Sequence, residues 1–414
     1  GGPGRLEVTA GRDVDLGASA GIVSRANLDN VALPDTGAAI QVSAGVGENG
    51  VDYAGAVARL AGQLETGNVD DATLWLARWL TGDETLAAPD ALAAVRAVEA
   101  AGSDAQREGV RSMLFTGLRV TGRDAVKADG GFAGDFQRGY AALELVFPGI
   151  EERNPDGGFT HYRGDVNLFA SRILTEHGGN IEFITPGGDV IVGLANTPAA
   201  LLATDVVGAG SGQRDAGVLG IAAIGSGDVF GVARGDMLVN QSRILTVGGG
   251  DVLLWSSEGD IDAGKGKKSA SVVPPPLTLV DKDGNVTQVL QGAASGSGIG
   301  ALQPAGGTAG EVDLIAYKGQ VNAGDAGIRA SKVTIAGECL NCGNIDAGVK
   351  VGTPVADTSA VTAASSGATN ADGGVGDATA ALSNNLSEAA RAAEEMKQAF
   401  KPTFITAEVI GHGE

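Results

Sequence analysis

Two stretches of the chain repeat each other. Residues 164–193 read GDVNLFASRILTEHGGNIEFITPGGDVIVG, and residues 235–264 read GDMLVNQSRILTVGGGDVLLWSSEGDIDAG. They align without a gap at an offset of 71 residues, with 12 of 30 positions identical. Within each copy Gly-Asp returns after 24 residues, from Gly164 to Gly188 and from Gly235 to Gly259. Self-similar units of this size, built of short strands and glycine turns, predict stacked coils of a right-handed parallel β-helix, a mainly β solenoid fold.

The composition of the 414-residue chain suits such a solenoid better than a compact enzyme. Glycine occupies 67 positions and aromatic residues make up only 4% of the chain, which fits a narrow, layered core of small residues. Asp and Glu outnumber Lys and Arg by 50 to 29, so the net charge is −21. This charge repels nucleic acid and anionic lipid. No apolar run approaches the ~20 residues that span a bilayer, so we predict no membrane-spanning segment.

The period of the hydrophobic residues changes along the chain. Residues 1–50 alternate apolar and polar side chains, which predicts β-helix coils. Residues 51–150 carry apolar side chains at helical spacing instead, which predicts a module of about five helices, inserted in the β array or packed beside it. Asp70 and Asp104 stand where helix N-caps are expected. We expect the apolar stripes of this helical module to form its own core rather than a ligand groove.

The strand pattern returns after the helical module. Residues 151–355 predict further coils, with a hairpin excursion near residues 274–292. Residues 356–383 have the Ala, Ser, Thr and Gly composition of a flexible linker. Residues 384–414 predict an amphipathic helix followed by a terminal strand. We expect this C-terminal capping helix to hide the β edge of the last coil, with binding of a partner as the alternative.

Several strings in the second half of the chain resemble a known family. They are Asp236-Met237-Leu238-Val239-Asn240-Gln241-Ser242-Arg243, Leu254-Trp255-Ser256-Ser257-Glu258-Gly259-Asp260-Ile261-Asp262-Ala263-Gly264, Ser295-Gly296-Ser297-Gly298-Ile299, Val321-Asn322-Ala323-Gly324-Asp325-Ala326-Gly327-Ile328 and the closing Phe404-Ile405-Thr406. Together they resemble the C-terminal region of filamentous-haemagglutinin-type exoproteins. The likeness covers most of residues 130–350 and the C-terminal end.

The resemblance implies a very large adhesin on the surface of a Gram-negative bacterium. Such a protein is secreted across the outer membrane by a dedicated partner β-barrel, in two-partner secretion, and forms a long β-helical fibre. The implied partners are this secretion barrel and a glycan or protein of a host cell, a neighbouring cell in a biofilm, or the matrix. The family brings no catalytic residues, so none is carried over to this chain.

Five aspartates of the predicted coils invite comparison with β-helical polysaccharide lyases and hydrolases, which cluster carboxylates on one face. They are Asp189, Asp228, Asp236, Asp251 and Asp260. Each stands at or near a turn glycine, where an aspartate bonds local backbone, so we interpret them as turn residues and predict no catalytic site. Bound calcium stays an alternative, although the strict Gly-Gly-x-Gly-x-Asp repeat of calcium-binding β-rolls is missing. We predict no cofactor and no metal site.

Two small groups of residues carry specific expectations. Cys339 and Cys342 are the only cysteines and have Cys-x-x-Cys spacing. Because zinc needs two more ligands, and a redox motif belongs at a strand-to-helix turn, we predict a loop-closing disulfide instead. Lys265, Lys267 and Lys268 form a basic cluster in an acidic chain. This cluster is a candidate contact for a polyanion such as an acidic polysaccharide, with a solvated loop as the alternative.

The leading hypothesis for function is structural and adhesive. The chain is predicted to be a rigid extracellular segment that projects or anchors a binding surface for cells or matrix, and not an enzyme. One alternative is a carbohydrate-active enzyme built on a β-helix. Another makes the helical module a recognition unit for a partner protein or glycan.

Overall fold

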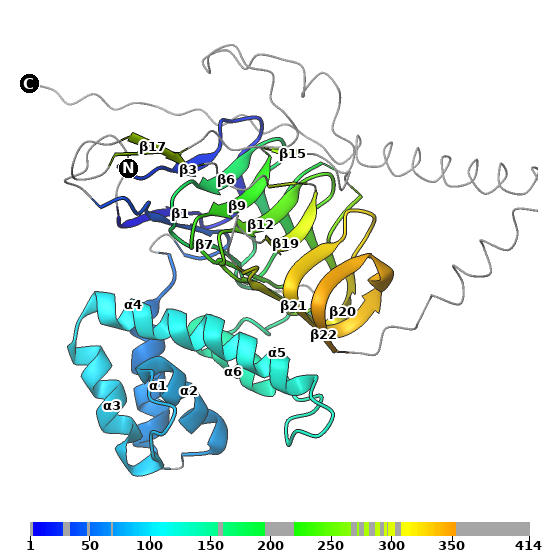
Figure 1. The fold of residues 1–414 in the computed structure, drawn as a ribbon. Coiled ribbons are helices and arrows are strands. Elements are labelled where there is room, and N and C mark those ends of the chain that lie inside the picture. The colour runs from blue at the N-terminus through cyan, green and yellow to red at the C-terminus, as the bar shows by residue number, and fades with distance from the viewer. Residues whose placement is uncertain are drawn as a thin grey trace, which may run out of the picture. The chain divides into compact units, whose positions relative to one another are not determined.

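The structure is a computed structural model. It describes residues 3–27, 34–47, 50–67, 69–155, 160–194, 219–265, 297–302 and 308–352, together with the backbone of four short strands between residues 271 and 295. The chain divides into a unit of residues 1–355 and a unit of residues 356–414. The predicted linker and the predicted C-terminal capping helix lie outside the described residues. The described part of the first unit is mainly β, with one helical module (Figure 1).

Parallel strands stack in three columns, one for each face of the coils. Face A consists of β1 (Arg5–Thr9), β4 (Ala39–Ser43), β7 (Ile181–Thr185), β10 (Val229–Ala233), β13 (Val252–Ser256) and parts of β20 (Glu311–Asn322), β21 (Ile328–Leu340) and β22 (Ile345–Gly352). Face B consists of β2 (Val14–Asp15), β5 (Val166–Asn167), β8 (Val190–Ile191), β11 (Met237–Leu238), β14 (Ile261–Asp262) and further parts of β20 and β21. Face C consists of β3 (Ile22–Ser24), β6 (Arg172–Thr175), β9 (Gly220–Ile224), β12 (Arg243–Val247), β19 (Gly298–Leu302) and the starts of β21 and β22. All these pairings are parallel, so the predicted parallel β-helix is confirmed.

The 24-residue spacing of Gly-Asp corresponds to one coil. Val166 pairs with Val190, and Met237 pairs with Ile261, in each case 24 residues further along the chain. Because β8 pairs with both β5 and β11, the two repeat copies lie two coils apart. The two copies of the repeat therefore occupy equivalent positions in stacked parallel coils.

The interior of the coils is a column of buried aliphatic side chains with one layer per coil. Phe183 in β7 is the largest of these side chains, and it faces Gly231 in the next strand of face A. A Cβ atom on Gly231 would overlap Cε2 of Phe183. Only glycine leaves room for the phenyl ring at this position, which explains why the run from Val229 to Ala233 contains one.

The helical module is inserted between β4 and β5. Its helices are α1 (Tyr53–Glu65), α2 (Asp71–Thr81), α3 (Ala88–Ala100), α4 (Ser103–Arg111), the π-helical turn η1 (Ser112–Thr116), α5 (Gly117–Ala125) and α6 (Gln137–Val146). Their buried apolar side chains form one cluster together with side chains of face A. The predicted stripes thus pack together in a core of the module, and this core continues onto face A of the β-helix.

The two predicted N-caps have different outcomes. Asp70 is the N-cap of α2, and its Oδ1 accepts a hydrogen bond of 2.7 Å from the Thr73 N–H, so this prediction is confirmed. The prediction for Asp104 is wrong, because Gly102, at φ 95°, is the N-cap of α4. Asp104 lies inside the first turn, where a carboxylate interacts favourably with the helix dipole. Because aspartate is favoured both at the N-cap and in the first turn of a helix, the sequence pattern around Asp104 resembles that of a cap.

Two antiparallel pairs interrupt the coils between β14 and β19. β16 (Leu277–Val280) pairs with β17 (Val286–Val289), and β15 (Ser271–Val272) pairs with β18 (Ala294–Ser295). Antiparallel pairing sets this excursion apart from the parallel stack. Among the helices that the structure describes, none has the length and apolarity needed to cross a membrane.

Candidate functional site

The central strands of face A are buried on both of their sides. Every residue of β7 and β13 is buried, although a strand with one solvated side alternates buried and exposed side chains. The side chains that point away from the coil interior form two columns across successive strands. The first column is Gln41, Glu182, Phe230, Leu253 and Asp313, and the second is Ser43, Ile184, Val232, Trp255 and Ile315. Most of these residues belong to the cluster that face A shares with the helical module.

One helical rod of the module lies along face A (Figure 1). It consists of α4, η1 and α5, which follow one another without a break. The rod carries five side chains at four-residue spacing: Arg107, Arg111, Phe115, Arg119 and Arg123. Residues four apart lie on one side of a helix, about 6 Å apart along its axis. Neighbouring strands are about 4.8 Å apart, so this row of side chains can meet successive strands of face A.

The first half of the row contacts β1, β7 and β10. Arg111 pairs with the buried Glu182 of β7. The ring of Phe115, in the π-helical turn, stacks on Phe230 of β10 with the ring centroids 4.9 Å apart. Arg107 Nη2 lies 3.4 Å from Glu7 Oε1 in β1. Ion pairs therefore flank an aromatic contact along the rod.

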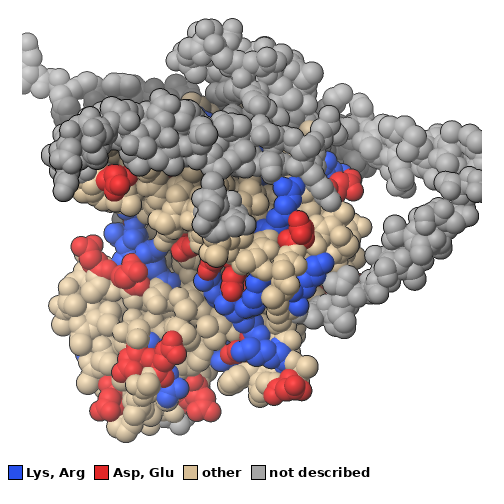
Figure 2. Space-filling view, in the orientation of Figure 1, with Lys and Arg blue, Asp and Glu red and all other residues tan. Residues whose placement is uncertain are grey.

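The second half of the row converges on Asp313 of β20. Arg123 donates to both carboxylate oxygens of Asp313, with distances of 2.8 Å and 2.7 Å. Arg119 Nε lies 3.3 Å from Oδ2 of the same residue, and Arg119 Nη1 donates to Asp251 Oδ2 at 3.1 Å. The Asp313 side chain is only 1% exposed. A carboxylate buried this deeply is destabilising unless it is paired, and the two arginines supply that pairing. Figure 2 shows Lys and Arg atoms beside Asp and Glu atoms along this junction.

Aromatic packing holds α6 against β13. The Trp255 indole, fully buried, makes edge contacts with Tyr140 and Phe136 at centroid distances of 5.7 Å and 6.4 Å. A Cβ atom on Gly139 would lie 2.5 Å from Cη2 of Trp255, so α6 approaches the strand closely at a glycine. The Tyr140 hydroxyl donates to the Ser257 carbonyl at 2.6 Å, and burial, followed by the nearby Glu151 carboxylate, raises the pKa of this hydroxyl.

The coil aspartates bond to the neighbouring coil. At one corner of the β-helix, Asp189 Oδ1 accepts the Asp236 N–H and Asp236 Oδ1 accepts the Asp260 N–H, both at 2.8 Å. At another corner, Asp228 Oδ1 accepts the Asp251 N–H at 2.8 Å. The expectation that these carboxylates bond local backbone is wrong, because parallel stacking brings the next coil's turn within reach. Burial raises the pKa of Asp189 and Asp228, opposed by the accepted backbone hydrogen bond.

The remaining predicted site residues are the two cysteines and the lysine cluster. Cys339 and Cys342 are joined by a disulfide at the last described coils, with Cys342 buried in the coil interior. Lys265 is exposed, whereas Lys267 and Lys268 lie outside the described residues. Within the described ranges, no group of three or more His, Cys, Asp or Glu side chains is arranged to hold a metal ion.

The sequence did carry a signal for the interface between module and coils. Where a strand has one solvated side, apolar and polar residues alternate, as in Arg5–Thr9. The strands Val229–Ala233 and Val252–Ser256 are instead almost continuously apolar, the pattern of strands buried on both faces. The second signal for this interface was the row of mainly arginine side chains spaced four residues apart along α4, η1 and α5.

Comparison with known families identifies the last coils. Residues 249–355 match a family model described as "Filamentous haemagglutinin family outer membrane protein". The chain carries a filamentous haemagglutinin family region. The resemblance read from the sequence is thus confirmed for these residues, which contain β13 to β22. Searches of curated proteins and of solved structures gave no match. The haemagglutinin family region supplies Trp255, Asp313 and Ile315 to the interface, while the helical module itself lies outside it.

Proposed function

We propose that the chain is a structural, non-catalytic segment of a large secreted surface exoprotein, in the C-terminal part of its β-helical fibre. The observation that carries the proposal is the unbroken parallel ladder of face A. It runs from β1 to β22 and enters the family-matched region at β13. Coils that contact only their neighbours extend a fibre by simple addition. Such a segment projects or anchors a surface that attaches to cells or matrix.

The family description supports the proposed location and partners. The match to an outer membrane protein family of the filamentous haemagglutinin type supports an extracellular position for this chain at the surface of a Gram-negative bacterium. In this proposal the chain reaches that position through a partner β-barrel in the outer membrane. The targets of attachment in this proposal are glycans or proteins of host cells, neighbouring cells or the matrix. The net charge of −21 argues against nucleic acid as a target.

The arrangement of the coil aspartates supports a non-catalytic role. A glycosidase needs two carboxylates that flank one substrate position. Asp189, Asp236 and Asp228 instead each accept a backbone N–H from the next coil. None of these three residues lines the surface cavity between α2 and α6 or the one between Tyr53, Arg107 and Pro148. The carboxylates are thus engaged in stacking the coils.

The helical module contributes rigidity in this proposal. Its rod contacts β1, β7, β10 and β20 through side chains at four-residue spacing. Coils that would otherwise be joined only to their neighbours are therefore also tied to a common helical rod. We propose that the module braces the β-helix over this length.

The test uses the full-length exoprotein in the bacterium that makes it. Gly231→Ala places a Cβ atom against Phe183 inside the coils, whereas Gly62→Ala, in α1, meets nothing within 4 Å. We expect Gly231→Ala to lower attachment per surface-exposed molecule, counted by antibody labelling, and Gly62→Ala to leave it unchanged. Equal attachment by both variants would contradict the structural role. Polysaccharide turnover by the purified chain that disappears in Asp189→Asn would show an enzyme instead.

A further inference from the structure

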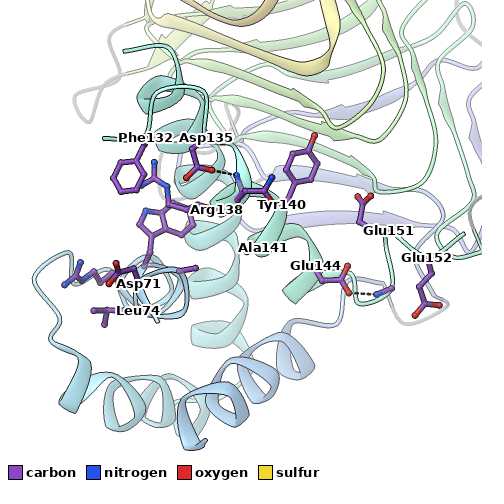
Figure 3. A pocket seen from close by; sticks show the side chains of 15 residues that line it. Asp71, Leu74, Phe132, Asp135, Arg138, Tyr140, Ala141, Glu144, Glu151 and Glu152 are labelled. Carbon is purple, nitrogen blue, oxygen red and sulfur yellow. Dashed lines mark hydrogen bonds between the residues drawn. The ribbon is translucent and has the colours of Figure 1, made fainter. Parts of the chain in front are cut away.

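The helical module contains a groove beside its interface with the β-helix. It has a volume of about 1000 Å³. Its walls come from α2, from the loop before α6, from α6 itself and from the segment that follows (Figure 3). No residue of face A lines the groove. Two of its lining residues, Tyr140 and Glu151, also contact the coils, through Ser257 and Arg234. A volume of this size accommodates several side chains.

Carboxylates dominate the charge of the groove. They are Asp71, Asp135, Glu144, Glu151 and Glu152, set against only two arginines, Arg78 and Arg138. Arg78 Nε donates to the Leu86 carbonyl at 2.9 Å, and Arg138 Nη2 donates to Asp124 at 3.1 Å. Glu151 is paired with Arg234 of the coils at 3.1 Å, whereas the other four carboxylates form no ion pair with a described Lys or Arg. The groove is therefore acidic toward a ligand, and the net charge of the chain attracts cations over a longer range.

Aromatic rings line the same groove. Trp75, Phe132 and Tyr140 belong to its walls, and the Phe132 side chain is 45% exposed in a chain that has few aromatic residues. The guanidinium carbon of Arg138 lies 3.7 Å from the ring centroid of Phe132 and 5.3 Å from that of Trp75. Arg138 thus already makes cation–π contacts with two rings of the groove. Aromatic faces attract the ammonium and guanidinium groups of a ligand in the same way.

The side chain of Arg138 provides a second observation about the ligand of this groove. It is only 8% exposed, and its buried Nε has no hydrogen-bond partner among the described atoms. A buried donor without an acceptor is destabilising. A carbonyl oxygen is the kind of acceptor that this donor lacks. Simple amines carry no such acceptor, but a peptide carries one at every residue.

We propose that this groove binds a basic peptide segment of a partner protein, with Lys or Arg side chains between the carboxylates and against the aromatic rings. Charge excludes acidic polysaccharide as the ligand, and the excess of carboxylates distinguishes the groove from one built for a neutral glycan. The inference goes beyond the structural role, because it gives the module a ligand. It stands whether or not the coils serve attachment.

The test is calorimetric titration of the full chain with a peptide of alternating Arg and Gly. We expect saturable binding that weakens with added salt, and no binding of the matched Glu and Gly peptide or of a neutral oligosaccharide. Phe132→Ala should weaken binding about two- to fivefold, the scale of one exposed cation–π contact. Asp71→Asn combined with Glu152→Gln, both exposed carboxylates, should weaken it about three- to tenfold.

The control is Glu84→Gln, an exposed carboxylate of the same module outside the groove, which should leave the affinity unchanged. Each variant replaces an exposed side chain, and unchanged circular dichroism and melting temperature confirm its fold. Absent binding, or equal affinity in groove and control variants, would overturn the proposal. So would agmatine, a guanidinium without a peptide bond, binding as tightly as the peptide.

Discussion

Arg123 on α5 and Asp313 on β20, 190 residues apart in sequence, form a bidentate ion pair with distances of 2.8 Å and 2.7 Å. The carboxylate is 1% exposed and the guanidinium side chain 27%. Two parallel hydrogen bonds to a planar guanidinium fix orientation as well as distance. This pair therefore reports on the position of the helical module against the coils.

The Trp255 side chain gives the first prediction. Trp255→Ala should lower the free energy of unfolding by about 3–5 kcal/mol, because a fully buried indole that packs on α6 leaves a cavity. Denaturant unfolding measures the change. Trp79→Ala, which removes a partly exposed indole from α2, is the matched control and should cost clearly less. Equal small losses for both variants would place Trp255 outside a packed interface.

Gly139 tests the same contact from the opposite side. Gly139→Val inserts atoms where a Cβ alone already lies 2.5 Å from the Trp255 ring, so we expect a loss of about 1–3 kcal/mol from overpacking. Gly62→Ala, in open space on α1, should not destabilise. Hydrogen exchange of residues 229–233 and 252–256 should accelerate in Gly139→Val. Unchanged protection of these strands would contradict close docking of α6.

The aspartate ladder predicts a pH dependence. Burial raises the folded-state pKa of Asp189 and Asp228, so the folded state holds these protons more tightly than the unfolded state. Their contribution to stability is fully present below the unfolded pKa, about 3.9, and is lost as the pH rises through the raised value. Asp189→Asn keeps the acceptor for the Asp236 N–H without the charge, as Asn180 does for Asp228. We therefore expect a higher melting temperature at neutral pH and a flatter pH profile.

Asp189→Ala is the contrasting variant. It removes the acceptor and leaves a part-buried N–H unsatisfied, which should destabilise by about 1–3 kcal/mol. Thermal unfolding between pH 4 and neutral distinguishes the variants. A melting temperature that falls equally in Asp189→Asn and Asp189→Ala would show that the carboxylate charge, not the acceptor, stabilises the coil.

The disulfide between Cys339 and Cys342 should contribute little to stability. It closes a very short loop, so the loop-entropy relation gives less than ~3 kcal/mol, and a Cys-to-Ser pair should lower the melting temperature by only about a few degrees. Mass spectrometry of unreduced, freshly secreted protein should find two hydrogens missing. Free thiols, or a stoichiometric metal that leaves with chelator, would contradict this expectation.

Local patterns were sufficient to predict the coils and the helices. The Gly-Asp spacing between residues 164 and 188 encodes one coil, because each coil repeats the same turn chemistry. The stripes of α1 to α6 encode helices, because apolar residues at helical spacing are a property of a single segment. Asp70 could be recognised as a cap for the same reason: its partner, Thr73, is three residues away.

Contacts between distant segments were not predictable from the same patterns. Asp189 looks like any turn aspartate, and only the stacking of coils shows that its acceptor serves Asp236. Arg123 looks like a solvated helix residue until β20 is placed beside it. The groove around Phe132 is likewise assembled from α2, α6 and their flanking loops, and no single segment carries its pattern.

A double-mutant cycle on Arg123 and Asp313 tests the docking of the helical module on face A most directly. Arg123→Ala, Asp313→Ala and the double variant are unfolded with denaturant, and the coupling energy is taken from the four free energies of unfolding. The structure predicts a favourable coupling of about 1–3 kcal/mol, the range of contacting residues in one ion-pair network. Additivity within about 0.5 kcal/mol, the behaviour of residues that do not touch, would contradict it.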